Sequence, residues 1–446
     1  MEFLEQKLFS AGGTYNPTFF KMHVGCDNSL DDLANLTDIE LCFYFHEYIH
    51  FLQNTTTTYG LLHSCIIINY IKYANEVVRN STSSEFNVPI EPISDLYGIR
   101  FNLDSYSVYQ GMSHNIGSIS SNQIQDINRV DSIVPDPMNL GNCLKKIQVT
   151  FSNSNEPYDF GATCIMESMA YIAEDLMFPS LIGVNNFLYN SAELVTQKIY
   201  PQLTVDRLNV FALCEVSLMM YHPALAFFDI LYLMKNENFI PSSPREVYNF
   251  LARIKITHEG KEKDAVQLLI DTGNKARQYL QDLFTADIFD NNRQWANLLI
   301  YNAVSVRLNR YFFLIDLLQA GDLRNNNHFA DLLNIIGSPI TTNNSDDMFF
   351  HLGDTSEIPA LNSKTIRVDL FWALHQIYLL FLGKQRSCKM RVFCSEMCNE
   401  KGIPDYTDTR CIENPWERSS DKELCAYGQI WKMWGLTGKV PVFPTA

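Results

Sequence analysis

The sequence predicts an α+β fold that is predominantly helical, and three patterns lead to this prediction. Residues 36–53 form a capped, largely apolar segment without glycine or proline, which predicts a buried helix. Short strand-like runs at 19–24 and 146–151 predict a smaller β component. We therefore expect a buried helix beside a small sheet, followed by an extended helical C-terminal half. Helical periodicity recurs along that second part, at 163–177, 205–221, 261–336 and 366–382.

The first element expected along the chain is a strand within residues 14–25 that begins after Pro17. Proline cannot donate a hydrogen bond to a neighbouring strand, so its place just before the run suits the edge of a sheet. An interior strand that only supports the following helix fits the same residues. The sequence leaves the edge and interior positions equally open.

The helix that follows carries the pattern H-E-x-x-H. Thr37 is a good N-cap, and Glu40 three residues later completes a capping box. In a helix, His46 and His50 lie one turn apart on one face, where both imidazoles can reach a single zinc ion. Glu47 lies beside them, where a carboxylate can accept a proton from a metal-activated water. The alternative is a pair of ordinary core histidines, but the buried, capped helix is the context that the motif requires.

The following segments alternate between helices and less regular chain. A second helix is expected from about Tyr59 to Val78. Residues 80–158 are rich in Ser, Asn, Asp, Pro and Gly, which predicts a loop-and-strand insertion with a strand-like run at Ile99–Leu103. A capping-box pattern that starts at Ser243 predicts a further helix to about Ile256.

We expect three parts in the chain. Residues 1–256 form the first domain, including the insertion at about 80–158, and the polar stretch at 256–263 marks its end. Residues 257–385 form a helical domain. The Cys-rich segment 386–446 packs on the body through its Trp-rich tail.

Composition limits the possible partners. The net charge of −16 argues against nucleic acid and against an anionic membrane surface, because both attract basic proteins. The first ten residues lack the basic and apolar regions of a secretory signal, and no run of 18 apolar residues occurs. We expect a cytoplasmic protein whose partner is a protein or peptide substrate. A regulatory partner is compatible with the same features.

Eleven cysteines are present, and in a reducing compartment most are expected to be core thiols. Five crowd into the C-terminal segment, where four thiolates could hold a second, structural zinc. Their spacing contains no C-x-x-C pair, so packing cysteines are the favoured interpretation. The five are Cys388, Cys394, Cys398, Cys411 and Cys425.

A catalytic zinc needs a third protein ligand. The pattern H-E-x-x-H-x-x-G-x-x-H is excluded, because Gln53 and Thr56 occupy its later positions. Glu167 is the favoured candidate, since it lies in a predicted helix that Thr163 can cap. Ala170, one turn later, is small enough for another helix to approach. The rivals are Glu76, on the helix after the motif, and Glu85, in a Ser-rich loop.

With Glu167 and Ala170 in a second helix, the motif resembles the gluzincin-type zinc metallopeptidases. The resemblance covers two helices and identifies a clan rather than one family. It implies a zincin-like core, which consists of the active-site helix and a small antiparallel sheet. In that core His46, His50 and Glu167 would be the zinc ligands and Glu47 the general base. Two departures are evident: the separation of His50 from Glu167 is long, and position 171, where many members place an Asp that orients a ligand, is Tyr.

Gluzincins often supply a Tyr or His that stabilises the oxyanion formed at the substrate carbonyl. By this resemblance Tyr158 and His222 are candidates for that role, although His222, just before Pro223, could equally cap a helix. Gln53, one turn after His50, is expected to be a polar surface position.

The sequence therefore favours a zinc-dependent peptidase, and an endopeptidase in particular, with Glu47 as general base. One alternative is a catalytically degenerate zincin-like protein that binds or regulates, although the intact Glu47 argues against it. A second is a toxin-like protease, but no delivery segment is evident. A third is a carboxylate-bridged di-iron bundle, which would need a second E-x-x-H that the chain lacks.

Overall fold

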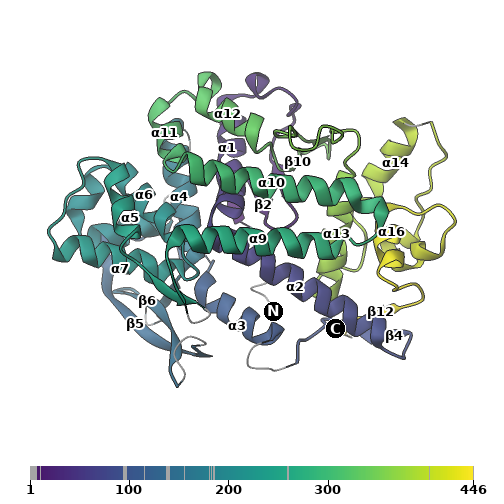
Figure 1. The fold of residues 1–446 in the computed structure, drawn as a ribbon, viewed down its shortest axis with the longest axis horizontal. Helices are drawn as coiled ribbons and strands as arrows, with labels where there is room; N and C mark the ends of the chain where they lie inside the picture. Colours follow the sequence, from purple (N-terminus) through teal and green to yellow (C-terminus); the bar gives the residue numbers. More distant parts are fainter. Residues whose placement is uncertain are drawn as a thin grey trace.

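The computed structural model shows a mixed α+β protein in which helices predominate over several small sheets. Helices α9 (Ala265–Leu283) and α10 (Asp290–Asn309) lie side by side across the middle of the molecule (Figure 1). Buried apolar side chains between Tyr15 and Leu436 form one connected core. No helix in the described ranges is long and apolar enough to cross a membrane. The structure describes residues 8–10, 12–93, 98–114, 116–136, 141–154, 156–179, 181, 183, 186–258, 261–400 and 402–444.

The largest sheet has five strands in the order β1-β2-β3-β10-β11. The predicted strand after Pro17 is wrong in its boundaries, because the chain reverses direction between β2 and β3. Thr18 and Phe20 adopt left-handed backbone conformations within that turn, with φ of 72° and 49°. The five strands are β1 (Leu8–Ser10), β2 (Gly13–Asn16), β3 (Lys21–Val24), β10 (Ile340–Thr342) and β11 (Met348–Phe349).

Strand β3 is an interior strand, so the edge alternative is wrong. Met22 is paired with Tyr15 of antiparallel β2 on one side and with Thr341 of parallel β10 on the other. The partner strand β10 comes from the region expected to be a separate helical domain. A sequence pattern cannot reveal a pairing between segments that lie so far apart in the chain.

The helix after β3 is the element that sequence predicts best. Helix α1 spans Asp38–Thr56, and Thr37 and Glu40 form the predicted capping box. Helix α2 (Thr58–Asn80) follows almost directly, as expected. Helix α1 packs against the five-stranded sheet, α2 and α10. Almost all of its residues after the first turn are buried, which explains its apolar composition.

The segment 80–158 contains both loops and regular elements. Residues 99–103, expected to be extended, instead begin helix α3 (Ile99–Gln110). This helix buries Leu103 and Tyr106, and the Tyr106 ring stacks on His63 of α2 at 5.0 Å. The predicted strand at 146–151 is confirmed within a three-stranded antiparallel sheet. Its strands are β5 (Ile124–Pro135), β6 (Cys143–Phe151) and β7 (Tyr158–Phe160), and β4 (Glu85–Asn87) lies in another sheet.

A group of helices follows β7. The predicted cap Thr163 is wrong by two residues, because Gly161 occupies the N-cap position of α4. The helix expected from Ser243 to Ile256 is also too long: it ends at Leu251, and Ile256 begins strand β8. The helices are α4 (Ala162–Met177), α5 (Phe187–Ile199), α6 (Arg207–Leu218), α7 (Pro223–Asn236) and α8 (Tyr248–Leu251). The strands β8 (Ile256–His258) and β9 (Lys261–Lys263) form a hairpin.

The predicted helical character of the second half is confirmed, although β10 and β11 interrupt it. Helix α9 packs against α2 and α10, and α10 packs against α1. The second half of the chain therefore also packs against α1, the helix that carries the H-E-x-x-H motif. The remaining helices of this part are α11 (Phe313–Ala320), α12 (Asn327–Ile335) and α13 (Val368–Phe381).

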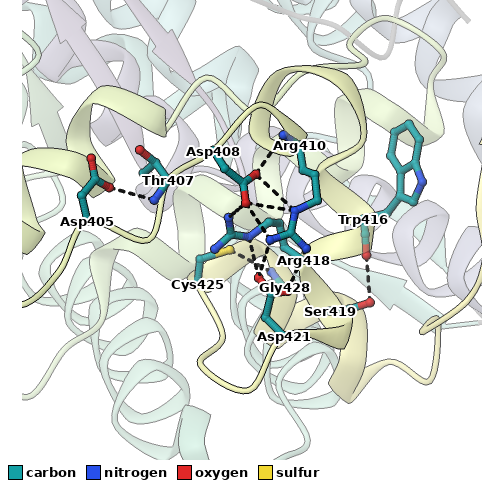
Figure 2. Close-up of polar contacts among 10 residues, drawn as sticks. All are labelled: Asp405, Thr407, Asp408, Arg410, Trp416, Arg418, Ser419, Asp421, Cys425 and Gly428. Atoms are coloured by element: carbon teal, nitrogen blue, oxygen red, sulfur yellow. Dashed lines mark hydrogen bonds and ion pairs between the residues drawn. The ribbon is translucent and has the colours of Figure 1, made fainter.

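The C-terminal segment packs on the body through α16 (Ala426–Met433), which contacts α13, and α14 (Arg391–Glu400) lies at the right of Figure 1. Trp431 is fully buried, and the Trp434 indole donates to the Leu283 carbonyl at 3.3 Å. An ion-pair network connects neighbouring residues within the C-terminal segment (Figure 2). Helix α15 (Arg410–Glu413) and strand β12 (Val440–Val442) complete the segment. The network consists of Asp408, Arg410, Arg418 and Asp421.

Candidate metal centre

Two helices bring three potential metal ligands together. One ligand atom each from His46, His50 and Glu167 lies within 4.8 Å of the other two, and no comparable group occurs elsewhere among the described residues. The Glu167 Oε2 atom is 3.7 Å from His46 Nε2 and 3.6 Å from His50 Nε2. Helix α1 provides the histidines and α4 provides the carboxylate. This group could hold a metal ion.

The arrangement follows from helix geometry and from a close approach of the two helices. The rings of His46 and His50 lie one turn apart on one face of α1, with centroids 4.9 Å apart. Helix α4 packs directly on α1, and Ala170 is fully buried one turn after Glu167. A small residue here permits the close helix packing that the sequence predicted.

The surroundings of the three atoms fit a metal ion. The side chains of His46, His50 and Glu167 are only 1%, 0% and 2% exposed. Their facing atoms have no hydrogen-bond partner within the described chain, and 3.6–3.7 Å is too long for a hydrogen bond. Ligands at about 2.0–2.2 Å from a shared tetrahedral zinc lie roughly 3.3–3.5 Å apart. A small contraction of this group around an ion would satisfy all three buried atoms.

A second carboxylate on α4 orients His46. The His46 Nδ1–H donates to Glu174 Oε2 at 2.6 Å, and Glu174 is itself buried. This bond directs His46 Nε2 towards Glu167. Sequence reasoning missed Glu174, having looked at Tyr171 for this role. The available signal was spacing: Glu174 follows Glu167 by seven residues, two turns along the same face.

The charges in the metal-free centre reinforce one another. Burial lowers the pKa of His46, but the carboxylates of Glu167 and Glu174 outweigh burial and raise the pKa to about 10. Burial raises the pKa of Glu167, but the imidazoles of His50 and His46 outweigh it and lower the pKa. Both shifts favour an ion pair between imidazole and carboxylate when no metal ion is present.

His50 is oriented by a neutral partner on its own helix. The His50 Nδ1–H donates to Gln53 Oε1 at 2.8 Å, and Gln53 Nε2 donates to the Met166 carbonyl at 3.0 Å. Gln53 is only 1% exposed, so the expectation of a surface position is wrong. Gln53 is buried because α4 lies against it. The motif alone does not specify the position of α4.

Glu47, which follows His46 on α1, lies against strand β2 of the sheet. It is fully buried, and the backbone of Gly13 in β2 packs against it. A Cβ atom at position 13 would lie 2.6 Å from Glu47 Cγ and 2.9 Å from Oε1, closer than real atoms approach. Glycine therefore allows β2 to pass directly beside the carboxylate. Gly13 is a residue of the site that sequence reasoning missed.

Tyr189 of α5 is a second neighbour that sequence reasoning missed. Its ring centroid is 6.1 Å from that of His46, and its side chain is half-buried. Burial, together with the nearby carboxylates of Glu167 and Glu47, raises the pKa of the Tyr189 hydroxyl. The hydroxyl therefore keeps its proton at neutral pH and can act as a donor. No local pattern marks this tyrosine, because α5 reaches the site only through the packing of α5 on α4.

The structure places the two predicted oxyanion donors in other hydrogen bonds. The Tyr158 hydroxyl points to the carbonyls of Met112 and His114, each at 3.1 Å. His222 caps α7: its Nδ1 accepts from the Leu225 amide at 3.4 Å.

The ring of His222 also has a partner on its other side. Its Nε2–H donates to the Lys145 carbonyl at 2.7 Å. Burial lowers the pKa of His222 to about 4, which keeps the ring neutral and suits one donating and one accepting nitrogen. The contacts of His222 therefore agree with the alternative expectation, in which this residue caps a helix.

The other candidate metal ligands lie apart from this centre. Glu76 on α2 and Glu85 on β4 are both exposed, and neither belongs to the three-residue group. The C-terminal cysteines also do not form such a group within the described chain. Cys394, Cys398 and Cys411 are buried and Cys388 and Cys425 half-buried, all as free thiols.

The chain was compared with protein-family models, with curated proteins and with solved structures, and none of them matches it.

Proposed function

We propose that this protein is a zinc-dependent peptidase in which His46, His50 and Glu167 hold the ion and Glu47 acts as general base. The observation that carries the proposal is the convergence of three enclosed ligand atoms, with the buried carboxylate of Glu47 next to His46 on the same helix. When bound, zinc supplies a Lewis acid that polarises a substrate carbonyl and activates a water molecule. The packing of α1 against both α4 and a small sheet supports a zincin-like core of the gluzincin type.

The chain's own residues have separate tasks in such a reaction. Glu47 accepts the proton of the attacking water and passes it to the leaving amine of the peptide. We assign the role of oxyanion donor to the Tyr189 hydroxyl, because its ring lies 6.1 Å from that of His46 and its pKa is raised. Glu174 fixes the orientation of His46. With these assignments Tyr189 takes the role first expected of Tyr158 or His222.

The burial of the site favours a second candidate function. His46, Glu47 and His50 are almost completely enclosed, so a polypeptide can reach them only after a covering element moves. A metal-binding protein with a regulatory rather than a catalytic role would need no such opening. The intact carboxylate of Glu47 favours the peptidase, which we place in the cytoplasm with a protein or peptide substrate.

Metal analysis combined with Glu47→Gln tests the proposal. Purified protein should contain one equivalent of zinc, and the variant should keep it, because Glu47 is not a ligand. The variant should cleave an unfolded protein substrate such as casein at least about 100-fold more slowly than wild type, because an amide cannot accept the proton. Absence of zinc from the wild-type protein would refute the metal site. Zinc without any cleavage would support the regulatory function instead.

A further inference from the structure

The side chain of Gln53 connects the two helices that build the metal centre. Its Oε1 atom lies 2.8 Å from His50 Nδ1 on α1, and its Nε2 atom lies 3.0 Å from the Met166 carbonyl on α4. Met166 directly precedes Glu167. One side chain thus contacts a histidine ligand and the backbone next to the carboxylate ligand.

The hydrogen-bond chemistry allows only one orientation of this amide. A backbone carbonyl can only accept, so the NH₂ group of Gln53 must face Met166. The carbonyl oxygen of Gln53 then faces His50, and His50 Nδ1 must carry the proton. The remaining nitrogen, His50 Nε2, presents its lone pair on the side of Glu167 Oε2, 3.6 Å away. A backbone group on α4 therefore determines the tautomer of a ligand on α1.

Burial makes these two bonds strong constraints. Gln53 is 1% exposed, so water does not compete for its partners. Breaking either bond would leave a buried polar group without a partner, which is unfavourable because water cannot replace the lost partner. The amide also adds no charge to a centre that already contains Glu47, Glu167 and Glu174. It can therefore orient His50 without increasing the negative charge around the ion.

We propose that Gln53 is a positioning residue of the metal centre, which holds the His50 tautomer and the spacing of α1 from α4 before the ion binds. This inference rests on the proposed metal site. Its consequence is that the three ligand atoms are preorganised, so that zinc binding needs little rearrangement. Loss of an orienting partner of a metal ligand typically weakens metal binding by about 10–100-fold.

The test compares Gln53→Met with Asn54→Leu. Methionine at position 53 retains the volume of glutamine but can neither accept from His50 nor donate to Met166. Asn54 is the matched control, because it is an equally buried amide on the same helix. Its shortest hydrogen bonds join it to the Tyr15 hydroxyl and the Gly60 carbonyl, each at 2.9 Å, and longer ones join it to the Ser64 hydroxyl and the Thr18 amide; none of these partners is a candidate metal ligand. Both variants lose buried hydrogen bonds, but only the first loses contacts to the metal centre.

Zinc affinity is measured by competition with a chromophoric chelator, and Co²⁺-loaded protein gives the visible spectrum of the site. We expect Gln53→Met to bind zinc about 10–100-fold more weakly and to change the Co²⁺ spectrum. Asn54→Leu should leave both at wild-type values. Should Gln53→Met not fold, Gln53→Asn is expected to weaken zinc binding similarly, because its shorter side chain cannot span both partners.

Two results would overturn the inference: wild-type zinc affinity in the position-53 variants, or equal weakening in Asn54→Leu. These results are distinct from failure of the proposed function. If the wild-type protein itself binds no zinc, the metal site is refuted. If the wild-type protein binds zinc and the position-53 variants bind it equally well, only the role of Gln53 is refuted.

Discussion

The C-terminal end of α1 is held by a buried ion pair between Arg307 of α10 and Glu215 of α6. The two side chains are 1% and 0% exposed. Arg307 also donates to the carbonyl and the hydroxyl of Thr56, the last residue of α1, each at 3.2 Å. Because the carbonyls at the C-terminal end of a helix carry partial negative charge, the guanidinium of Arg307 stabilises this end of α1.

We expect Arg307→Met to destabilise the protein strongly. Methionine fills much of the same space, but the variant leaves the Glu215 carboxylate buried without its cation. The Tyr248 hydroxyl still donates to Glu215, yet a neutral donor does not replace the charge. Removing one partner of a buried pair costs about 3–5 kcal/mol. This loss is a large part of a total stability that is typically about 5–15 kcal/mol.

Urea denaturation of the metal-free protein, followed by circular dichroism, measures the change in the free energy of unfolding. The control is Arg310→Met, at the C-cap position that directly follows α10. Arg310 pairs with Asp331 at 2.9 Å, but both side chains are about half exposed. An exposed pair contributes about 0–1 kcal/mol, so this variant should remain close to wild type. If Arg307→Met costs no more stability than Arg310→Met, the proposed anchoring of α1 is refuted.

Two further predictions concern the third ligand and the sheet. Glu167→Ala should remove stoichiometric zinc and peptidase activity, whereas Glu76→Ala, on an exposed face of α2, should change neither; the reverse pattern would assign the ligand to α2. Met22→Pro should lower the melting temperature sharply, because β3 is paired on both sides and proline removes a ladder hydrogen bond. The control Phe349→Pro, in the edge strand β11, should have a smaller effect; equal melting temperatures in the two variants would contradict the interior position of β3.

Local patterns predicted the elements whose chemistry is contained within a few neighbouring residues. The capping box of Thr37 and Glu40 determines where α1 begins, and the spacing of His46 and His50 places both rings on one face. Glu167 could also be selected, because a rigid helix with a small residue one turn later was visible in the sequence. Residues Ile99–Leu103 were expected to be extended, but they begin helix α3, which packs against α2.

The sequence by itself determined the H-E-x-x-H motif, its helix and the candidate third ligand, because each depends on the period of a single helix. Only the tertiary structure decided which groups surround that motif. Gln53 is buried because α4 covers it, and Tyr189 reaches the site because α5 packs on α4. Strand β3 is interior because β10 pairs with it from more than 300 residues away. These contacts join distant segments, and no local periodicity records which buried surfaces will meet when the chain folds.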